Sequence, residues 1–429
     1  MTSGHRTTPV TTPDTTAAPP PAAPSAPAPR GYFTLVNQMR AVAALLVVWG
    51  HLVGRWLEKE NLEWGPQGLS ERFVTGPLNI IQNTGFLGVA LFFLISGFVV
   101  TRAASVETTG TFLVRRAMRI YPPLAAGVAL CVAAAYVHFR LGIKTAPWEQ
   151  VTPVEILKSM TLVNFVSIPQ VVIVAVAWTL VIEVIFYALI CAFSPFLRSR
   201  LPDALTPLAI LGVLVLVAVN GARLGESFFL LAVSASYVPL LVLGQVIYLV
   251  SQRGMRPLLG AGLAGLAWGV FVWGLERTQP AFLTPEASYG SSITVALCLF
   301  LVAVLAEGRL RPNRLLGLVA DRSYSLYLVH GPVGLLTLDV LTRTAGLAYR
   351  WALVLAVLAT GLVTEVVHRT MERPFIRWAR RWTSRPREVT PAPAGADSPE
   401  PEPEPDPQPE PDPQPEPTRA EVGSTRRHG

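Results

Sequence analysis

The sequence is poor in charged residues. Charged side chains make up 15% of its 429 residues, whereas a soluble domain usually has about a quarter. Hydrophobic residues make up 51% of the chain, and the mean hydropathy is +0.44. So little charge excludes an ordinary water-soluble domain and indicates a protein that is embedded in a lipid bilayer.

The sequence also has only three cysteines. Cys131, Cys191 and Cys298 lie far apart within apolar runs, with neither the spacing of metal ligands nor a disulfide framework. We interpret them as small residues of the apolar core. A glycine-rich nucleotide loop, a nucleophile-elbow serine and a histidine–glutamate zinc signature are absent from the sequence as well. We therefore expect no bound metal.

Long apolar runs dominate what remains. A helix needs about 20 apolar residues to cross the hydrocarbon core of a bilayer. We therefore predict an all-α, polytopic membrane protein with about ten transmembrane helices. The predicted spans lie at about 35–57, 80–101, 121–141, 172–196, 204–222, 228–250, 257–275, 288–306, 315–340 and 347–368.

Two segments of biased composition flank these spans. Residues 1–32 are rich in Thr, Pro and Ala, and residues 384–429 alternate proline with acidic residues. Neither segment has enough apolar side chains to offset the entropy of ordering, so we predict two disordered tails. The transmembrane domain then covers 33–383. The C-terminal tail is interpreted as a stiff spacer, or alternatively as the partner-binding arm of an inactive scaffold.

The net charge of +7 is explained by membrane topology. Lys and Arg gather in segments 102–120, 197–203, 251–256, 307–314 and 369–387, and few occur in the alternate loops. By the positive-inside rule, these basic segments face the cytoplasm, and both termini lie there too. The basic residues are thus topological markers, and we expect no nucleic-acid partner.

Arg40 and His51 stand out within the first apolar run. Eleven residues make about three helical turns, so both side chains lie on one face, roughly 16 Å apart. An arginine at the centre of a membrane helix costs about 2.5–3.5 kcal/mol. A histidine near neutral pH suits a general base. The alternatives are that Arg40 is a lipid anchor and that His51 makes only structural hydrogen bonds.

Small residues mark the second span. Gly85, Gly88, Ser96 and Gly97 are positions where another helix or a ligand can approach the backbone closely. We interpret all four as helix-packing positions.

Two arginines precede the third span. Arg116 and Arg119 are three residues apart and are therefore neighbours on one helix face. Two forked guanidinium groups can hold a phosphate or pyrophosphate. The alternative interpretation is that they only anchor the loop on the positive side of the membrane.

Glu183 is a lone carboxylate in the fourth span. An acid inside the membrane is protonated, paired with a cation on another helix, or lines a polar cavity. Arg40 or His51 is the expected partner, and Tyr187 shares the face of Glu183 at i+4. The alternative is a purely structural link between helices.

A polar stripe runs along the ninth span. Ser323, Tyr327 and His330 occur at i, i+4 and i+7, beside Tyr324, and Pro332 is expected to kink the helix that follows. His330 is thus a second candidate imidazole. Its alternative role is a hydrogen bond that only positions the helix.

Taken in this order, the segments resemble the acyltransferase-3 family of bacterial membrane acyltransferases, over about residues 33–380. The most specific element is the arginine and histidine separated by ten residues, Arg40 and His51. The sequence departs from the family at Asn37, Ala90 and Val184, where members usually have acids. The supporting motifs are Gly88–Phe98, Arg115–Pro122, Trp178–Glu183, Ser323–His330 and Glu372–Pro374.

The resemblance implies the substrates. It implies transfer of an acyl group, usually acetyl, from cytosolic acyl-coenzyme A to a hydroxyl of a carbohydrate or glycoside. It also implies the cytoplasmic membrane of a bacterium as the location. Arg40, Arg116 and Arg119 would then hold the phosphates of the donor. An envelope polysaccharide and a small secreted glycoside both stay open as acceptors.

The resemblance also implies the catalytic residues. His51 would deprotonate the acceptor hydroxyl, or the acyl group would pass through a covalent relay on the protein. Glu183 would fix the tautomer of the imidazole or balance the charge of Arg40. The choice of His51 over His330 as the base comes from the family pattern alone. The alternative function is a polytopic transporter that uses the buried Arg, His and Glu as a substrate or proton path.

Overall fold

The protein is described here by a computed structural model that covers residues 33–80, 84–143, 150–199, 201–283 and 289–384. The described residues form helices joined by turns and contain no β-strand, so the predicted all-α class is confirmed. They belong to one compact unit. The two predicted tails lie outside the described residues, except for Ser384.

The predicted membrane spans correspond to observed helices. Eight helical segments are long and apolar enough to cross a membrane, and two shorter apolar helices, Leu205–Asn220 and Gly290–Ala306, coincide with the other two predicted spans. The eight segments are Thr34–Glu60, Gly85–Val106, Thr109–Arg140, Ala175–Arg198, Glu226–Arg253, Pro257–Thr278, Arg314–Thr344 and Tyr349–Thr383.

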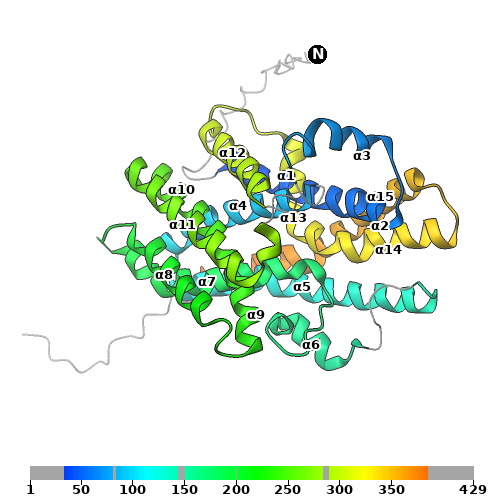
Figure 1. Cartoon of the computed structure of the whole chain (residues 1–429), viewed down its shortest axis with the longest axis horizontal. Helices are drawn as coiled ribbons and strands as arrows, with labels where there is room; N and C mark the ends of the chain where they lie inside the picture. Colours follow the sequence, from blue (N-terminus) through cyan, green and yellow to red (C-terminus); the bar gives the residue numbers. More distant parts are fainter. Residues whose placement is uncertain (1–32, 81–83, 144–149, 200, 284–288, 385–429) are drawn as a thin grey trace, which may run out of the picture. The chain divides into compact units, whose positions relative to one another are not determined.

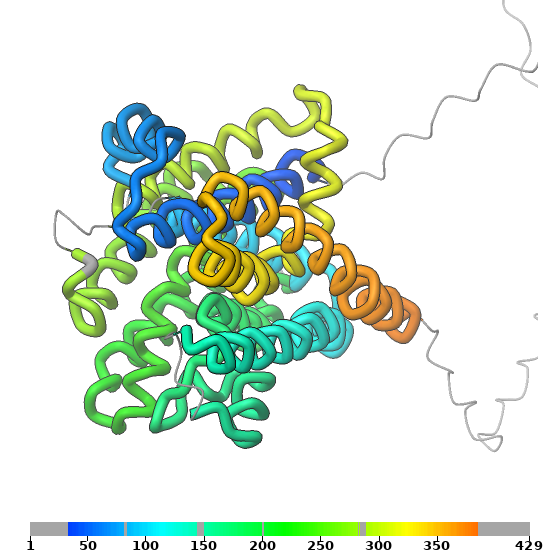
Figure 2. The backbone as a smooth tube through the Cα atoms, turned by 90° about the vertical axis from the view of Figure 1, so that its right-hand side faces the viewer, coloured from blue at the N-terminus to red at the C-terminus, as the bar shows by residue number. Residues whose placement is uncertain are grey.

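Several spans are built from more than one helix in sequence (Figure 1). Figure 2 shows α15 and α16, in orange, as one long segment that ends at the edge of the bundle. The α-helices are α1 Thr34–Trp49, α2 Trp56–Glu60, α3 Gly65–Ser70, α4 Gly85–Val106, α5 Thr109–Arg140, α6 Pro153–Thr161, α7 Trp178–Arg198, α8 Leu205–Asn220, α9 Glu226–Ala235, α10 Val238–Arg253, α11 Pro257–Thr278, α12 Gly290–Ala306, α13 Arg314–Val329, α14 Leu336–Asp339, α15 Tyr349–Val367 and α16 Arg373–Thr383.

Polar contacts hold the beginning of α1 to the segment before α13. The carboxylate of Glu307 accepts hydrogen bonds from the first backbone N–H groups of α1, those of residues 34–36, at 2.9–3.2 Å. Gln38 donates to the carbonyl of Asn313 at 2.7 Å and accepts from its N–H at 3.2 Å. Free N–H groups at a helix start need such partners. These contacts fix α1 alongside α13, which positions both candidate residues of the first span.

The helix α4 lies at the centre of the bundle and packs closely through glycine. A Cβ atom on Gly88 would clash with the backbone of Ala43 in α1, and one on Gly97 would overlap the carbonyl of Leu241 in α10. Close approach of this kind is typical of small residues in membrane helices. The packing interpretation is therefore confirmed for Gly88 and Gly97. It is wrong for Gly85, where an added Cβ would meet nothing within 4 Å.

Two π-helical turns interrupt the spans that contain the candidate histidines. His51 lies in the turn η1, Gly50–Arg55, and His330 begins the turn η8, His330–Leu335, which contains Pro332. Proline lacks the N–H of a regular helix, and π-turns often occur at functional sites. The predicted kink after His330 thus takes the form of a π-turn.

The basic cluster before the third span lies on a helix rather than in a loop. The helix α5 begins at Thr109, so Arg115, Arg116 and Arg119 all belong to it. Thr108 caps this helix by accepting a hydrogen bond from the N–H of Thr111, a local signal for a helix start. Because Arg116 and Arg119 are both helical, their predicted common face is confirmed.

The three cysteines are free thiols. Cys131 and Cys191 are partly buried and pack against the apolar core. Cys298 is exposed on α12, so its assignment to the core is wrong. On a membrane helix, a small apolar side chain is equally suited to face lipid.

Candidate functional site

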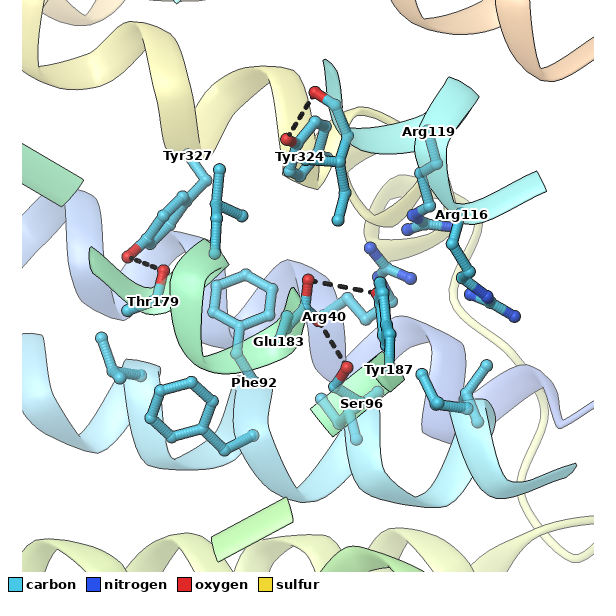
Figure 3. A pocket seen from close by; sticks show the side chains of 17 residues that line it. Arg40, Phe92, Ser96, Arg116, Arg119, Thr179, Glu183, Tyr187, Tyr324 and Tyr327 are labelled. Carbon is cyan, nitrogen blue, oxygen red and sulfur yellow. Dashed lines mark hydrogen bonds between the residues drawn. The ribbon is translucent and has the colours of Figure 1, made fainter. Parts of the chain in front are cut away.

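A narrow cavity, here called the arginine cavity, lies between α1, α4, α5, α7 and α13 (Figure 3). Its volume is about 60 Å³. Apolar side chains of α4 form much of its wall, and polar side chains from all five helices line it. The polar and aromatic hydroxyl residues are Arg40, Ser96, Arg116, Arg119, Thr179, Glu183, Tyr187, Tyr324 and Tyr327.

Glu183 is held by hydroxyl groups within this cavity. Ser96 donates a hydrogen bond to one carboxylate oxygen, and Tyr187 donates to the other at 3.3 Å. The hydroxyl of Ser96 thus links α4 to α7, and the interpretation of Ser96 as a helix-packing position stays a prediction. Neither imidazole is a hydrogen-bond partner of Glu183 in the described part of the chain. Of the two expected roles for Glu183, its placement favours the balance of Arg40, which lines the same cavity.

Arg116 and Arg119 of α5 both line the cavity. The guanidinium of Arg116 lies over the rings of Phe112 and Tyr187, at 5.3 and 5.9 Å from their centroids. Such cation–π contacts hold a guanidinium without using its N–H donors. Within the described residues, the buried Nε of Arg116 has no hydrogen-bond partner. The Nε of Arg116 is therefore an open donor for an anion.

Arg40 contacts the polar stripe of α13. Its Nε donates to the hydroxyl of Ser323 at 3.4 Å. Tyr324, the residue after Ser323, donates to the carbonyl of Ile120 in α5 at 3.0 Å. These contacts link three of the helices around the cavity and fix the side from which Arg40 enters it.

A second, wider cavity, here called the histidine cavity, has a volume of about 670 Å³. His51 lines it together with residues from η1, α4, α7, α9 and the segment before α7. Aromatic, polar and charged side chains line its wall. They include His51, Arg55, Glu58, Gln170, Trp178, Tyr237, Gln279, Tyr289 and Tyr327.

The two cavities share a wall. Val89 and Tyr327 line both of them. The hydroxyl of Tyr327 lies 2.9 Å from that of Thr179 and 3.1 Å from the carbonyl oxygen of Val176, and its ring packs edge-on against Phe92. These contacts hold the phenol in one place. The arginine and histidine cavities are thus adjacent, with Val89 and Tyr327 between them.

His51 and His330 are directly hydrogen-bonded. His51 Nδ1 lies 3.0 Å from His330 Nε2 and 3.1 Å from the carbonyl oxygen of Val47, and His330 Nδ1 lies 3.3 Å from the carbonyl oxygen of Leu326. A carbonyl oxygen can only accept, so this network assigns a hydrogen to Nδ1 of both neutral rings. His330 Nε2 then accepts from His51 Nδ1. The basic nitrogen left to the pair is Nε2 of His51.

The structure brings the predicted residues together in two groups. The arginine cavity contains Arg40, the two arginines of α5, Glu183 and the three tyrosines, whereas His51 lines the other cavity. The predicted common face of Arg40 and His51 is confirmed by their hydrogen-bond partners. Arg40 contacts Ser323 and His51 contacts His330, and both partners belong to the same polar stripe on α13 and η8. Among the described residues, no three His, Cys, Asp or Glu side chains gather as metal ligands would.

Sequence reasoning missed several residues of the cavities. Arg55 is four residues after His51 and could have been found by helical spacing. Thr179 lies within the quoted motif of α7, but its contact with Tyr327 depends on how two helices pack. Tyr237 and Tyr289, which directly precede α10 and α12, carried no signal in the sequence.

Comparison with known proteins identifies the class. The model of the family described as "Acyltransferase domain" matches residues 34–366, from the first residue of α1 almost to the end of α15. The chain belongs to this acyltransferase family. The acyltransferase is also 25% identical to Nodulation protein 10 of Rhizobium leguminosarum bv. viciae over 313 residues, which cover 68% of this chain and 82% of that protein. No solved structure matches the acyltransferase.

This membership makes the protein an enzyme, a multi-pass membrane acyltransferase, and favours that class over a transporter. The matched region contains every residue that lines the two cavities.

The hydrogen-bond network predicts the tautomers of the two histidines. We expect His51 and His330 to carry hydrogen on Nδ1, against the preference of free histidine for Nε2. Nitrogen-15 NMR of histidine-labelled protein in nanodiscs, assigned with His51→Ala and His330→Ala variants, measures this directly. His138, outside both cavities, serves as an internal reference. A hydrogen on Nε2 of His51 would contradict the assignment.

Proposed function

We propose that this acyltransferase moves an acyl group, most simply acetyl, from acyl-coenzyme A to a hydroxyl of a carbohydrate or glycoside. The observation that supports this best is the shared wall. A narrow cavity lined by guanidinium groups meets a wide cavity with an unprotonated imidazole nitrogen, and only Val89 and Tyr327 line both. A thioester donor and a hydroxyl acceptor could thus approach the same point from different cavities.

The arginine cavity suits the donor. Arg116 and Arg119 would hold phosphates of coenzyme A, because guanidinium groups bind phosphate bidentately and the Nε of Arg116 has no other partner among the described residues. The pantetheine arm would then extend past Glu183 toward Tyr327. Along the first span, Arg40 and His51 are about 16 Å apart, and the arm would cover this distance.

The histidine cavity suits a sugar. Its volume of about 670 Å³ falls within the usual range for small-molecule sites. Aromatic rings stack on the apolar faces of sugars, while amides and charged groups bind their hydroxyls. The wall provides Trp178, Tyr237 and Tyr289 for the first purpose, and Gln170 and Gln279 for the second.

The reaction would need one proton transfer in each direction. Nε2 of His51 takes the proton of the acceptor hydroxyl as its oxygen attacks the thioester carbonyl. The carbon–sulfur bond then breaks, and the imidazolium returns the proton to the thiolate, so that coenzyme A leaves as a thiol. His330 and the carbonyl of Val47 accept from Nδ1 and steady the imidazolium. Glu183 would balance the charge of Arg40 near the donor.

The distribution of basic residues supports a location and an orientation. The segments rich in arginine flank the same ends of the spans as Arg116 and Arg119. By the positive-inside rule, the arginine cavity would face the cytoplasm of a bacterium, where acyl-coenzyme A is made, and both termini would lie there.

His51→Ala tests the proposed function. Purified protein in nanodiscs, given radiolabelled acetyl-coenzyme A and a panel of glycosides and envelope glycans, should lose about 10²–10⁴-fold in transfer rate, because a general base is lost. His138→Gln is the matched control, since His138 pairs with Asp339 and lines neither cavity. Full activity of a folded His51→Ala protein would contradict the proposal. Proton-driven uptake without acyl-coenzyme A would favour a transporter instead.

Arg116→Gln combined with Arg119→Gln tests donor binding. We expect the KM for acyl-coenzyme A to rise by about tenfold or more, because hydrogen bonds between charged groups contribute about 1.5–3 kcal/mol each. The KM for the acceptor should change little. Arg115→Gln is the matched control, because Arg115 binds Glu107 and Thr383 instead. An equal rise in the control would show that the effect is structural.

Val89→Phe tests the shared wall. A larger side chain there should hinder the approach of the thioester to His51 and lower kcat by about 10²-fold, while coenzyme A still binds in the arginine cavity. Steady-state kinetics together with calorimetry of coenzyme A binding separate the two effects. Val89→Ala, which opens the same position, is expected to keep its activity. An unchanged kcat in Val89→Phe would place the meeting point elsewhere.

A further inference from the structure

The last helix of the described chain, α16, presents three different faces. It spans Arg373–Thr383, and at about 100° per residue its side chains fall into three separate stripes. One stripe faces the protein, one is aromatic and one is basic. They consist of Ile376, Ala379 and Thr383; of Phe375, Trp378 and Trp382; and of Arg373, Arg377, Arg380 and Arg381.

Both ends of α16 are held by the rest of the protein. Just before it, the buried carboxylate of Glu372 accepts hydrogen bonds from Ser325 at 2.6 Å and from the ring of His368 at 2.9 Å. At its other end, Arg115 of α5 donates to the hydroxyl of Thr383 at 3.0 Å. The rotation of α16 about its axis is therefore fixed, and so is the direction in which each stripe points.

The aromatic stripe is exposed. Trp378 and Trp382 are 50% and 52% exposed, and their rings are stacked with centroids 6.0 Å apart. Phe375 is 37% exposed. Large aromatic side chains are rarely left in water beside one another without a partner surface.

The basic stripe has no acidic counterpart on the helix. Arg373, Arg377, Arg380 and Arg381 are all exposed, and the helix contains neither Asp nor Glu. The stripe lies next to the aromatic one on the side away from the protein. An amphipathic helix with aromatic residues on one face and arginines on another is typical of the membrane surface.

The length of the segment places α16 at the end of a span. The helical segment Tyr349–Thr383 has 35 residues, or about 52 Å at 1.5 Å per residue, whereas the hydrocarbon core is about 30 Å thick. The exposed apolar surface of α15, with Leu358, Leu362 and Val366, leads directly to it. Tryptophan is enriched at this depth, where one end of a span meets the headgroups.

We propose that α16 binds the anionic surface of the bilayer. Its tryptophans lie among the lipid headgroups at the edge of the apolar layer, and its arginines bind the phosphates of acidic phospholipids. The charge complementarity and the continuity with the lipid-facing side of α15 favour this partner over a protein. The inference is independent of the proposed function, since no residue of α16 lines either cavity.

Quenching by brominated lipid tests this proposal. The full chain is placed in nanodiscs of phosphatidylcholine and phosphatidylglycerol, with bromine on only one of the two lipids at equal bromine content. The chain has ten tryptophans, so the difference between the protein and its Trp378→Phe/Trp382→Phe variant isolates the pair. We expect these two tryptophans to be quenched more by the brominated anionic lipid. Each arginine at an anionic surface favours such lipids by about fivefold.

Substitution of the arginines supplies the control. Arg377→Gln with Arg381→Gln should remove the preference for the anionic lipid, whereas Arg309→Gln with Arg311→Gln, an equal loss of charge in an exposed segment outside α16, should keep it. Absence of quenching by either lipid, or equal quenching by both, would overturn the proposal. So would a raised KM for acyl-coenzyme A in Arg377→Gln/Arg381→Gln with unchanged quenching, because the arginines would then serve the donor.

Discussion

The polar seam between α1 and α13 is the constraint on which the site depends. From one end to the other it consists of the Glu307 cap on α1, the paired amide contacts of Gln38, the bond from Arg40 to Ser323, and the bond between His51 and His330. In an apolar medium an unpaired polar group is costly, so each of these contacts restricts how the two helices can slide or rotate. The seam therefore sets the register of every candidate residue on the first span.

The seam also separates two kinds of chemistry. One end presents cationic and acidic groups to a narrow cavity, and the other presents an imidazole to a wide one. Charges act strongly on one another where water is scarce. On the wide side, the hydrogen-bond partner of His51 is a second imidazole, His330, and Arg55 lines the same cavity.

The sequence alone predicted the spans and the faces of single helices, because apolar length and the helical period are local properties. It predicted the stripe of Ser323 and His330 for the same reason. It did not predict that Ser96 donates a hydrogen bond to Glu183 or that Tyr327 lines both cavities, because these contacts depend on which helices become neighbours. The π-turns at both histidines also have no signal as clear as an apolar run.

The cap on α1 has a consequence for the synthesis of the protein. The backbone N–H groups at the start of the first span are satisfied by Glu307, which is 273 residues further along the chain. At typical rates of translation, the ribosome needs on the order of tens of seconds to reach that acid after the first span has been made. Until then the start of α1 relies on water or lipid headgroups. The span that contains α1 is thus made long before it can reach its final register.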